Sequence, residues 1–202
     1  MMNLFSAILL SAAQISLPQA AHPEKWFFSA DYPTSALDKN KVGTTWFEIS
    51  VSESGKPFAC STIVSSGVID LDRKSCAAIL VRGHFTPARD GNGQALPGTI
   101  RHAVRWSIPP RKAPLSEMPA DLVLPVNRLP ARAKGSVILR LVEASDGAVE
   151  SCEIEKTSGS RQLDSLACVT VSKVKMPQPL LGPDGMPVRA VRVRRIEFKV
   201  TQ

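Results

Sequence analysis

The chain has few of the residues from which catalytic and metal sites are built. Its 202 residues include only three histidines, His22, His84 and His102, which are scattered and form no constellation. The motifs Gly-x-Ser-x-Gly and His-Glu-x-x-His and the phosphate-binding glycine loop are absent. We therefore expect a protein that is not an enzyme and that carries no catalytic residue, metal or cofactor.

Aromatic residues and dense runs of charge are also scarce. Aromatic types make up 5% of the chain against 44% for all hydrophobic types, so its cores must be mainly aliphatic. The formal net charge is +7, yet no dense run of Lys and Arg concentrates it. A basic chain suits nucleic acid, anionic lipid or an acidic protein. Without a basic run, we expect no nucleic acid partner.

The most apolar segment is too short for a membrane span. Leu4 to Leu17 is uncharged, but a bilayer needs about 20 apolar residues. Pro18-Gln19-Ala20-Ala21 then offers small residues for cleavage. We interpret residues 1–21 as a secretory signal peptide that lies outside the fold, and expect an exported chain. An uncleaved N-terminal anchor is the alternative, because no Lys or Arg precedes the apolar run.

A repeat with a period of 92 residues organises the rest of the chain. Glycines, prolines and cysteines determine turns and crosslinks, so their coincidence indicates two copies of one small domain. The coincident residues include Gly43 with Gly135, Gly55 with Gly147, Cys60 with Cys152, Leu71-Asp72 with Leu163-Asp164, Cys76 with Cys168, and Pro87 with Pro179.

Each copy contains two cysteines at the same spacing. Cys60 and Cys76 lie 16 residues apart, as do Cys152 and Cys168. Four cysteines in an exported chain favour disulfides and allow three connectivities. The repeat favours Cys60–Cys76 and Cys152–Cys168, because each copy must be closed by its own parts. A four-cysteine zinc site is the rival interpretation, but no Cys-x-x-Cys pair is present.

The hydrophobic periodicity of each copy predicts two strands, a helix and a last strand. Alternation around Thr44–Val51 and Val137–Leu141 is typical of half-buried strands, with a hairpin turn and a second strand after each. Leu71, Cys76 and Ile79 fall on one helix face, which would pin the helix to the strand below it through the disulfide. We expect last strands at 99–108 and 189–200, and a helix cap at Asp70, Asp72 or Asp164.

An arginine cluster marks the last strand of the second copy. Arg189, Arg192, Arg194 and Arg195 crowd this strand, and its apolar phase slips there, which suggests a β-bulge. Charge on an edge strand commonly prevents sheet-to-sheet aggregation. The functional interpretation is an edge that accepts an acidic peptide as an added strand.

Several motifs, in the correct order, resemble the C-terminal domain of TonB, the periplasmic energy transducer of Gram-negative bacteria. The resemblance covers residues 31–108, and a more divergent second copy covers residues 123–201, with a Pro-rich linker at 109–122. The first copy carries Asp31-Tyr32-Pro33, Val42-Gly43, Gly55, Ser65-Ser66-Gly67, Leu71-Asp72 and Phe85-Thr86-Pro87-Ala88-Arg89-Asp90-Gly91; the second keeps Leu124-Pro125, Gly135, Gly147, Ser158-Gly159 and Leu163-Asp164.

The resemblance implies an α+β fold with two tandem small domains, each a three-stranded antiparallel sheet packed by helices. It also implies a periplasmic binding protein whose strand edge pairs with a peptide or a segment of an outer-membrane receptor. The alternative is a structural envelope scaffold or homo-oligomerising module without energy transduction. The edge residues that the resemblance points to are Arg101, Ala103, Arg105, Arg192, Arg194 and Arg195.

Overall fold

The computed structural model describes residues 14–201, in which copy one (31–108) forms a three-stranded antiparallel sheet. Phe47, Ile49 and Val51 are fully buried and belong to one core with Ile79 of the helix. The residues between them therefore face the other side of the sheet. The strand order is β3 (Pro57–Val64), β2 (Gly43–Val51), β7 (Gly98–Trp106), and the helix is α2 (Ile69–Arg82).

Copy two (123–201) repeats this arrangement and adds a strand. Its antiparallel strands follow the order β10, β9, β11, and β8 runs parallel to β11 from Leu122↔Ile196 to Val126↔Val200. The predicted α+β fold with two tandem domains is therefore confirmed, and β8 is an element that the periodicity did not predict. The elements are β8 (Leu122–Val126), β9 (Ser136–Glu143), β10 (Val149–Lys156), α3 (Arg161–Val171) and β11 (Ala190–Val200).

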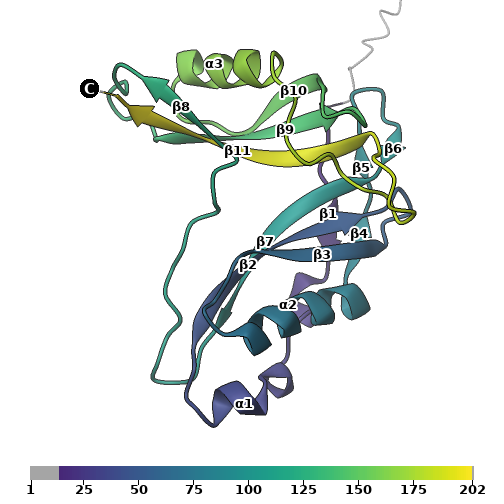
Figure 1. Cartoon of the computed structure of the whole chain (residues 1–202), viewed down its shortest axis with the longest axis vertical. Helices are drawn as coiled ribbons and strands as arrows, with labels where there is room; N and C mark the ends of the chain where they lie inside the picture. The colour runs from purple at the N-terminus through teal and green to yellow at the C-terminus, as the bar shows by residue number, and fades with distance from the viewer. Residues whose placement is uncertain (1–13, 202) are drawn as a thin grey trace, which may run out of the picture.

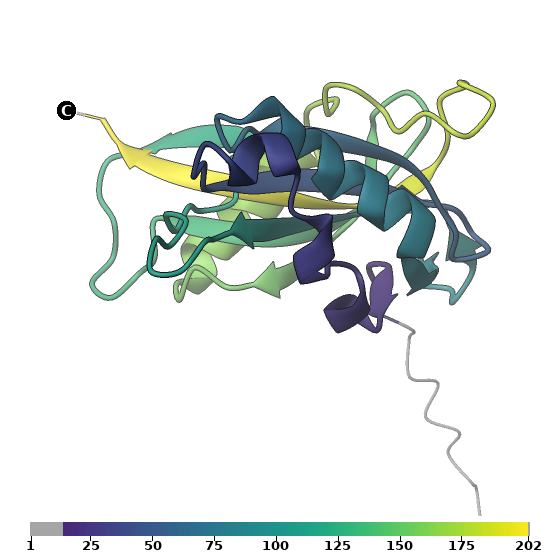
Figure 2. The same ribbon diagram turned by 90° about the horizontal axis from the view of Figure 1, so that it is seen from below.

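The two copies are joined into one seven-stranded sheet. The junction is a parallel pairing of Val191 in β11 with Gly98 in β7. Helices α3 and α2 lie at opposite ends of the molecule, each on the outer side of its own strands (Figure 1). Seen from below, α2 crosses the near side of the copy-one strands (Figure 2). Both helices therefore face away from the junction between the copies.

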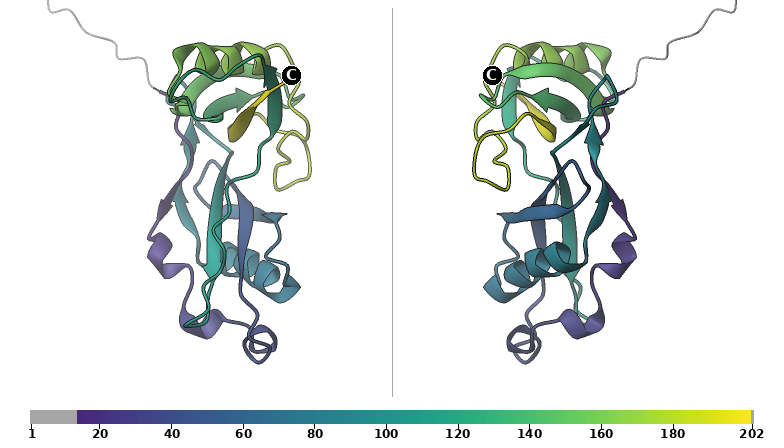
Figure 3. Two further views of the ribbon diagram at one scale, coloured as in Figure 1. Left: turned by 90° about the vertical axis from the view of Figure 1, so that its left-hand side faces the viewer. Right: turned by 90° about the vertical axis from the view of Figure 1, so that its right-hand side faces the viewer.

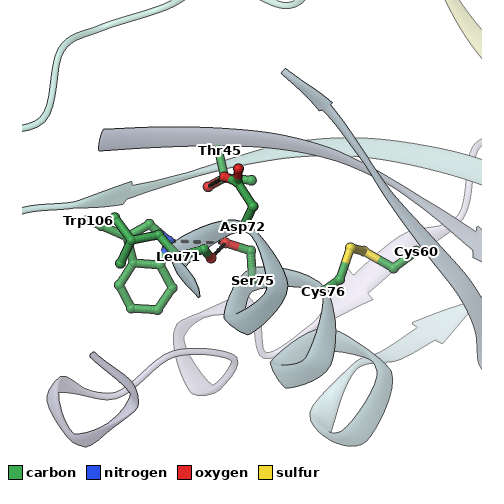
Figure 4. The surroundings of a disulfide bond; sticks show 7 residues. All are labelled: Thr45, Cys60, Leu71, Asp72, Ser75, Cys76 and Trp106. Carbon is green, nitrogen blue, oxygen red and sulfur yellow. Dashed lines mark hydrogen bonds between the residues drawn. A yellow bond between two sulfur atoms is a disulfide. The ribbon is translucent and has the colours of Figure 1, made fainter. Parts of the chain in front are cut away.

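Each helix is attached to its sheet by a disulfide, and α2 is attached also by an aspartate. Cys60–Cys76 and Cys152–Cys168 join strand to helix with Cα atoms 5.4 and 5.7 Å apart, as the repeat favoured. Figure 4 shows the disulfide of copy one. Asp72 accepts hydrogen bonds from the Thr45 hydroxyl at 2.7 Å and the Ser66 amide at 2.9 Å. We expected a cap at Asp70, Asp72 or Asp164, and this prediction is wrong. The N-cap residues are Val68 in α2 and Ser160 in α3, and Asp72 lies one turn inside α2, where it holds the preceding loop.

Short elements surround this frame. Asp31, in the second of the 3₁₀ helices, accepts hydrogen bonds from both Nη atoms of Arg82. Among the helices of residues 14–201, none is long and apolar enough to cross a membrane. The short elements are β1 (Gln19–Ala21) paired with β4 (His84–Thr86), β5 (Ala88–Arg89) paired with β6 (Ala95–Leu96), α1 (Thr34–Leu37), and 3₁₀ helices at Pro23–Lys25 and Ser29–Asp31.

The segment that we expected to lie outside the fold is partly inside it. Ile15 is 1% exposed, and Gln19–Ala21 form strand β1. Residues 1–13 of the predicted signal peptide lie outside the described residues. The prediction that everything up to Ala21 stands apart from the fold is therefore wrong for residues 15–21.

Candidate functional site

The strands β7 and β11 start as a pair and then separate. The Val191 amide donates to the Pro97 carbonyl at 2.9 Å, so the main-chain groups of residue 97 point toward β11. Because these groups alternate sides along a strand, those of Arg101, Ala103 and Arg105 point to the same outer edge. Within residues 14–201, no main-chain partner pairs with that edge beyond Gly98. This stretch of β7 is an unpaired strand edge.

The separation begins at a glycine because the two strands touch there. A Cβ atom on Gly98 would lie 2.8 Å from the Val191 carbonyl oxygen and 2.7 Å from the Ala88 Cβ. Any larger residue would push β11 off β7, so Gly98 permits the junction between the two copies.

The predicted edge on β11 is used inside the fold. Along one side, β11 pairs with β9 from Ala190 to Glu197 without a register shift, so the β-bulge that we expected is absent. Along the other side it pairs with β8, and the amide of Asp121 donates to the Arg195 carbonyl at 2.8 Å. The alternation of apolar residues changes phase along β11 because buried arginines occupy the core-facing positions in the first half of the strand.

The buried arginines of β11 form a charge network together with Arg101 of β7. The network consists of Arg101, Arg192 and Arg194 with Glu48, Asp121 and Glu143. Arg194 donates from Nε and Nη2 to the two oxygens of Glu143 at 2.8 and 2.9 Å. Arg192 reaches across to Glu48 of copy one at 2.8 Å. Arg101 donates to Glu48 at 2.8 Å and forms two bonds with Asp121 at 2.7 and 2.6 Å. Three positive and three negative side chains, at most 13% exposed, therefore join both copies and the linker.

Two members of the network, Asp121 and Arg194, keep their charges despite burial. Burial alone would raise the pKa of Asp121, but hydrogen bonds and charge from Arg101, with the Arg195 amide and Arg194, lower it overall. Burial would likewise lower the pKa of Arg194, but Glu143 and Asp121 raise it. Asp121 and Arg194 thus keep their charges because each lies beside oppositely charged partners.

The remaining predicted edge residues lie near the linker. Arg105 is exposed, and its Nη2 donates to the Ala113 carbonyl at 2.9 Å. Arg195 pairs with Glu117 of the linker and with Glu197, each at 3.1 Å. Ala103 lies directly opposite Trp46 in the pairing of β7 with β2. The structure thus brings Arg101, Arg192 and Arg194 together in the interior and leaves Ala103 and Arg105 at the edge.

A groove of about 610 Å³ lies between the two copies. Trp46 lies on its copy-one side, and the linker crosses beside it, since Trp46 Nε1 donates to the Ser116 hydroxyl at 2.9 Å. Sequence reasoning missed the groove, because its walls come from both copies and the linker. Its lining residues include Trp46, Met118, Lys134, Ile138, Lys156 and Arg195.

The region that the structure covers contains no metal-binding cluster, and two of its histidines pack or bond within copy one. No group of three or more His, Cys, Asp or Glu side chains could hold a metal ion among residues 14–201. His102 stacks edge-on against Trp26 with ring centroids 5.4 Å apart, and His84 bonds to the Arg82 carbonyl. The arrangement offers main-chain hydrogen bonds, an aromatic ring and cations, which suit an extended peptide.

The comparisons with known proteins point to one family. The family model described as Gram-negative bacterial TonB protein C-terminal matches residues 29–108 and again residues 123–200. The searches of curated proteins and of solved structures found no match.

Proposed function

Since the chain belongs to the TonB C-terminal family, with two tandem copies, we propose that it is a periplasmic binding protein that engages a peptide or an outer-membrane receptor segment at a strand edge. Domains of this family act in the Gram-negative envelope as protein-interaction modules rather than enzymes. The strand that would accept the partner is β7, at residues 101–105. The observation that supports this is the divergence of β7 from β11 after Gly98, which leaves the edge unpaired.

An added peptide strand would find hydrogen-bond partners and side-chain contacts there. The outward amides and carbonyls of Arg101, Ala103 and Arg105 supply the main-chain ladder. Trp46 beside Ala103 supplies an aromatic surface in the adjoining groove. The exposed Arg105 guanidinium favours a partner with an acidic side chain at that end of the segment.

The matched pair Ala103→Pro and Ala103→Ser tests the edge. Proline removes the outward amide hydrogen of residue 103 and places its ring at the edge, but leaves the inward bonds to β2 intact. Serine keeps the amide. We expect the proline variant to recover about tenfold less receptor from an outer-membrane extract, equivalent to one lost hydrogen bond and a steric clash, and the serine variant to match the wild type.

Hydrogen exchange provides the second readout. Bound partner should slow exchange at the amides of residues 101, 103 and 105 in the wild type, while the amides of β3 exchange as before. Equal recovery by all three proteins, or protection confined to β3, would sink the proposal for β7.

A structural scaffold is the second candidate, and one observation favours it. Strands β3 and β10 stand at the two ends of the main strand order, and β10 carries Glu150, Glu153, Glu155 and Lys156. In contrast, β3 from Pro57 to Val64 has no charged residue. An uncharged terminal strand lacks the usual protection against pairing with another chain. If copies of the chain assemble through β3, Thr62→Lys should convert a dimer to a monomer in light scattering, and Ala103→Pro should leave it unchanged.

A further inference from the structure

The end of the apolar N-terminal run and the residues that follow it connect the two copies. Ile15 is 1% exposed and shares a core with Ala88 and Leu96 of copy one and Val142 and Val191 of copy two. Its amide donates to the Glu153 carboxylate at 3.1 Å. This segment therefore packs against the junction at which β7 and β11 pair.

The contacts continue without a break to Ala21. Ser16 and Arg89 exchange two main-chain hydrogen bonds, at 2.9 and 3.0 Å. Pro18 is buried and lies against Gly98, and Gln19–Ala21 pair with β4 as strand β1. Figure 3 shows this segment, in purple, running from the copy-two strands along the side of copy one. Removal of residues 14–21 would expose Val191 and the Gly98 junction to water.

The sequence contains a better processing point than the one after Ala21. Leader peptidases require small residues at the first and third positions before the cut. A cut after Ala21 has Gln19 at the third position, whereas a cut after Ala13 has Ser11 there and Ala13 at the first. Leu4 to Leu10 before it meets the minimum apolar length, about 7 residues, of a leader.

We infer that the leader ends at Ala13 and that the mature chain begins at Gln14. Hydrolysis of the Ala13–Gln14 peptide bond adds one water, leaving a carboxylate on the released leader and a free α-amino group on Gln14. Gln14 is exposed in the structure, so this new terminus requires no rearrangement. The mature protein keeps the whole segment that joins the copies. The inference is independent of what the β7 edge binds.

The test is the N-terminus of the chain after export. The full chain, with its own leader, is produced in a Gram-negative host and recovered from the periplasm for intact mass and N-terminal peptide analysis. We expect Gln14 as the first residue. An N-terminal glutamine can cyclise with the loss of one ammonia, and a chain with that mass also counts as beginning at Gln14. Any other first residue, including Met1 or His22, would overturn the inference.

Two matched variants test the position of the cut independently. A bulky charge at the first position before the cut should block processing, so Ala13→Arg should remain at the precursor mass. Ala21→Arg, at an exposed position of β1, should be processed like the wild type. The reverse pattern, or processing of both variants, would overturn the inference.

Discussion

Glu143 is the side chain on which the charge network can be tested most directly. It is 1% exposed and accepts hydrogen bonds from both Nε and Nη2 of Arg194. The Nη1 atom of Arg192 lies 3.7 Å from its carboxylate. The change Glu143→Gln preserves the shape but removes the charge and turns one acceptor into a donor that faces a guanidinium. Arg194 then retains only Asp121 as a charged partner.

The expected loss of unfolding free energy arises because the buried charge of Arg194 loses its partner Glu143. Removing one member of a buried pair costs about 3–5 kcal/mol, and we take the lower value, about 3 kcal/mol, because Gln keeps one acceptor. For a chain of this size, each kcal/mol lowers Tm by about 2–4 °C. We therefore expect Glu143→Gln to lower Tm by about 6–12 °C.

Thermal and urea unfolding followed by circular dichroism measure this effect. The control is Asp146→Asn, which removes the ion pair with Lys175 where both side chains are more than half exposed; it should leave Tm unchanged. In the double variant Glu143→Gln/Arg194→Gln, the cost should fall below the sum of the single costs by about 1–3 kcal/mol. If Glu143→Gln unfolds at the same temperature as the Asp146 control, the network does not stabilise the fold.

Three further predictions concern other contacts. Replacing Cys60 and Cys76 by Ala should cost about 3 kcal/mol, the chain-entropy value for a 16-residue loop, measured by urea unfolding. Hydrogen bonds from Arg82, opposed by burial, hold the pKa of Asp31 far below its usual range. Its stabilisation is therefore complete above about pH 4 and lost as pH falls, so Asp31→Asn should flatten the acid limb of a pH titration of Tm. Ile15→Ala should cost about 2–5 kcal/mol in calorimetry, because the side chain is buried between both copies.

The local elements were predictable because their signals are local. The alternation of Phe47, Ile49 and Val51 and the helix face of Leu71 and Ile79 each lie within a few residues, and burial follows them. The disulfides also followed, since the repeat placed one pair in each copy.

The junction between the copies was not predictable from such signals. It depends on one parallel pairing between Gly98 and Val191, which lie far apart in the sequence. Hydrophobic periodicity is a local pattern and does not predict such a pairing. Arginine is seldom buried, so the sequence alone predicts surface positions for Arg192 and Arg194. Their burial depends on Glu48 and Asp121, whose proximity appears only in the folded chain. Strand β8 was missed because it is short and contains Pro125.

The disulfides also determine how far the chain can be stretched. Each one closes a segment of 16 residues, and a fully extended chain spans at most about 3.3–3.6 Å per residue. A pulling force could therefore unravel either copy and still leave about 50–60 Å of its contour locked between the cysteines. Reduction would release that length in both copies, so the redox state of the compartment sets the extensibility of a chain under load.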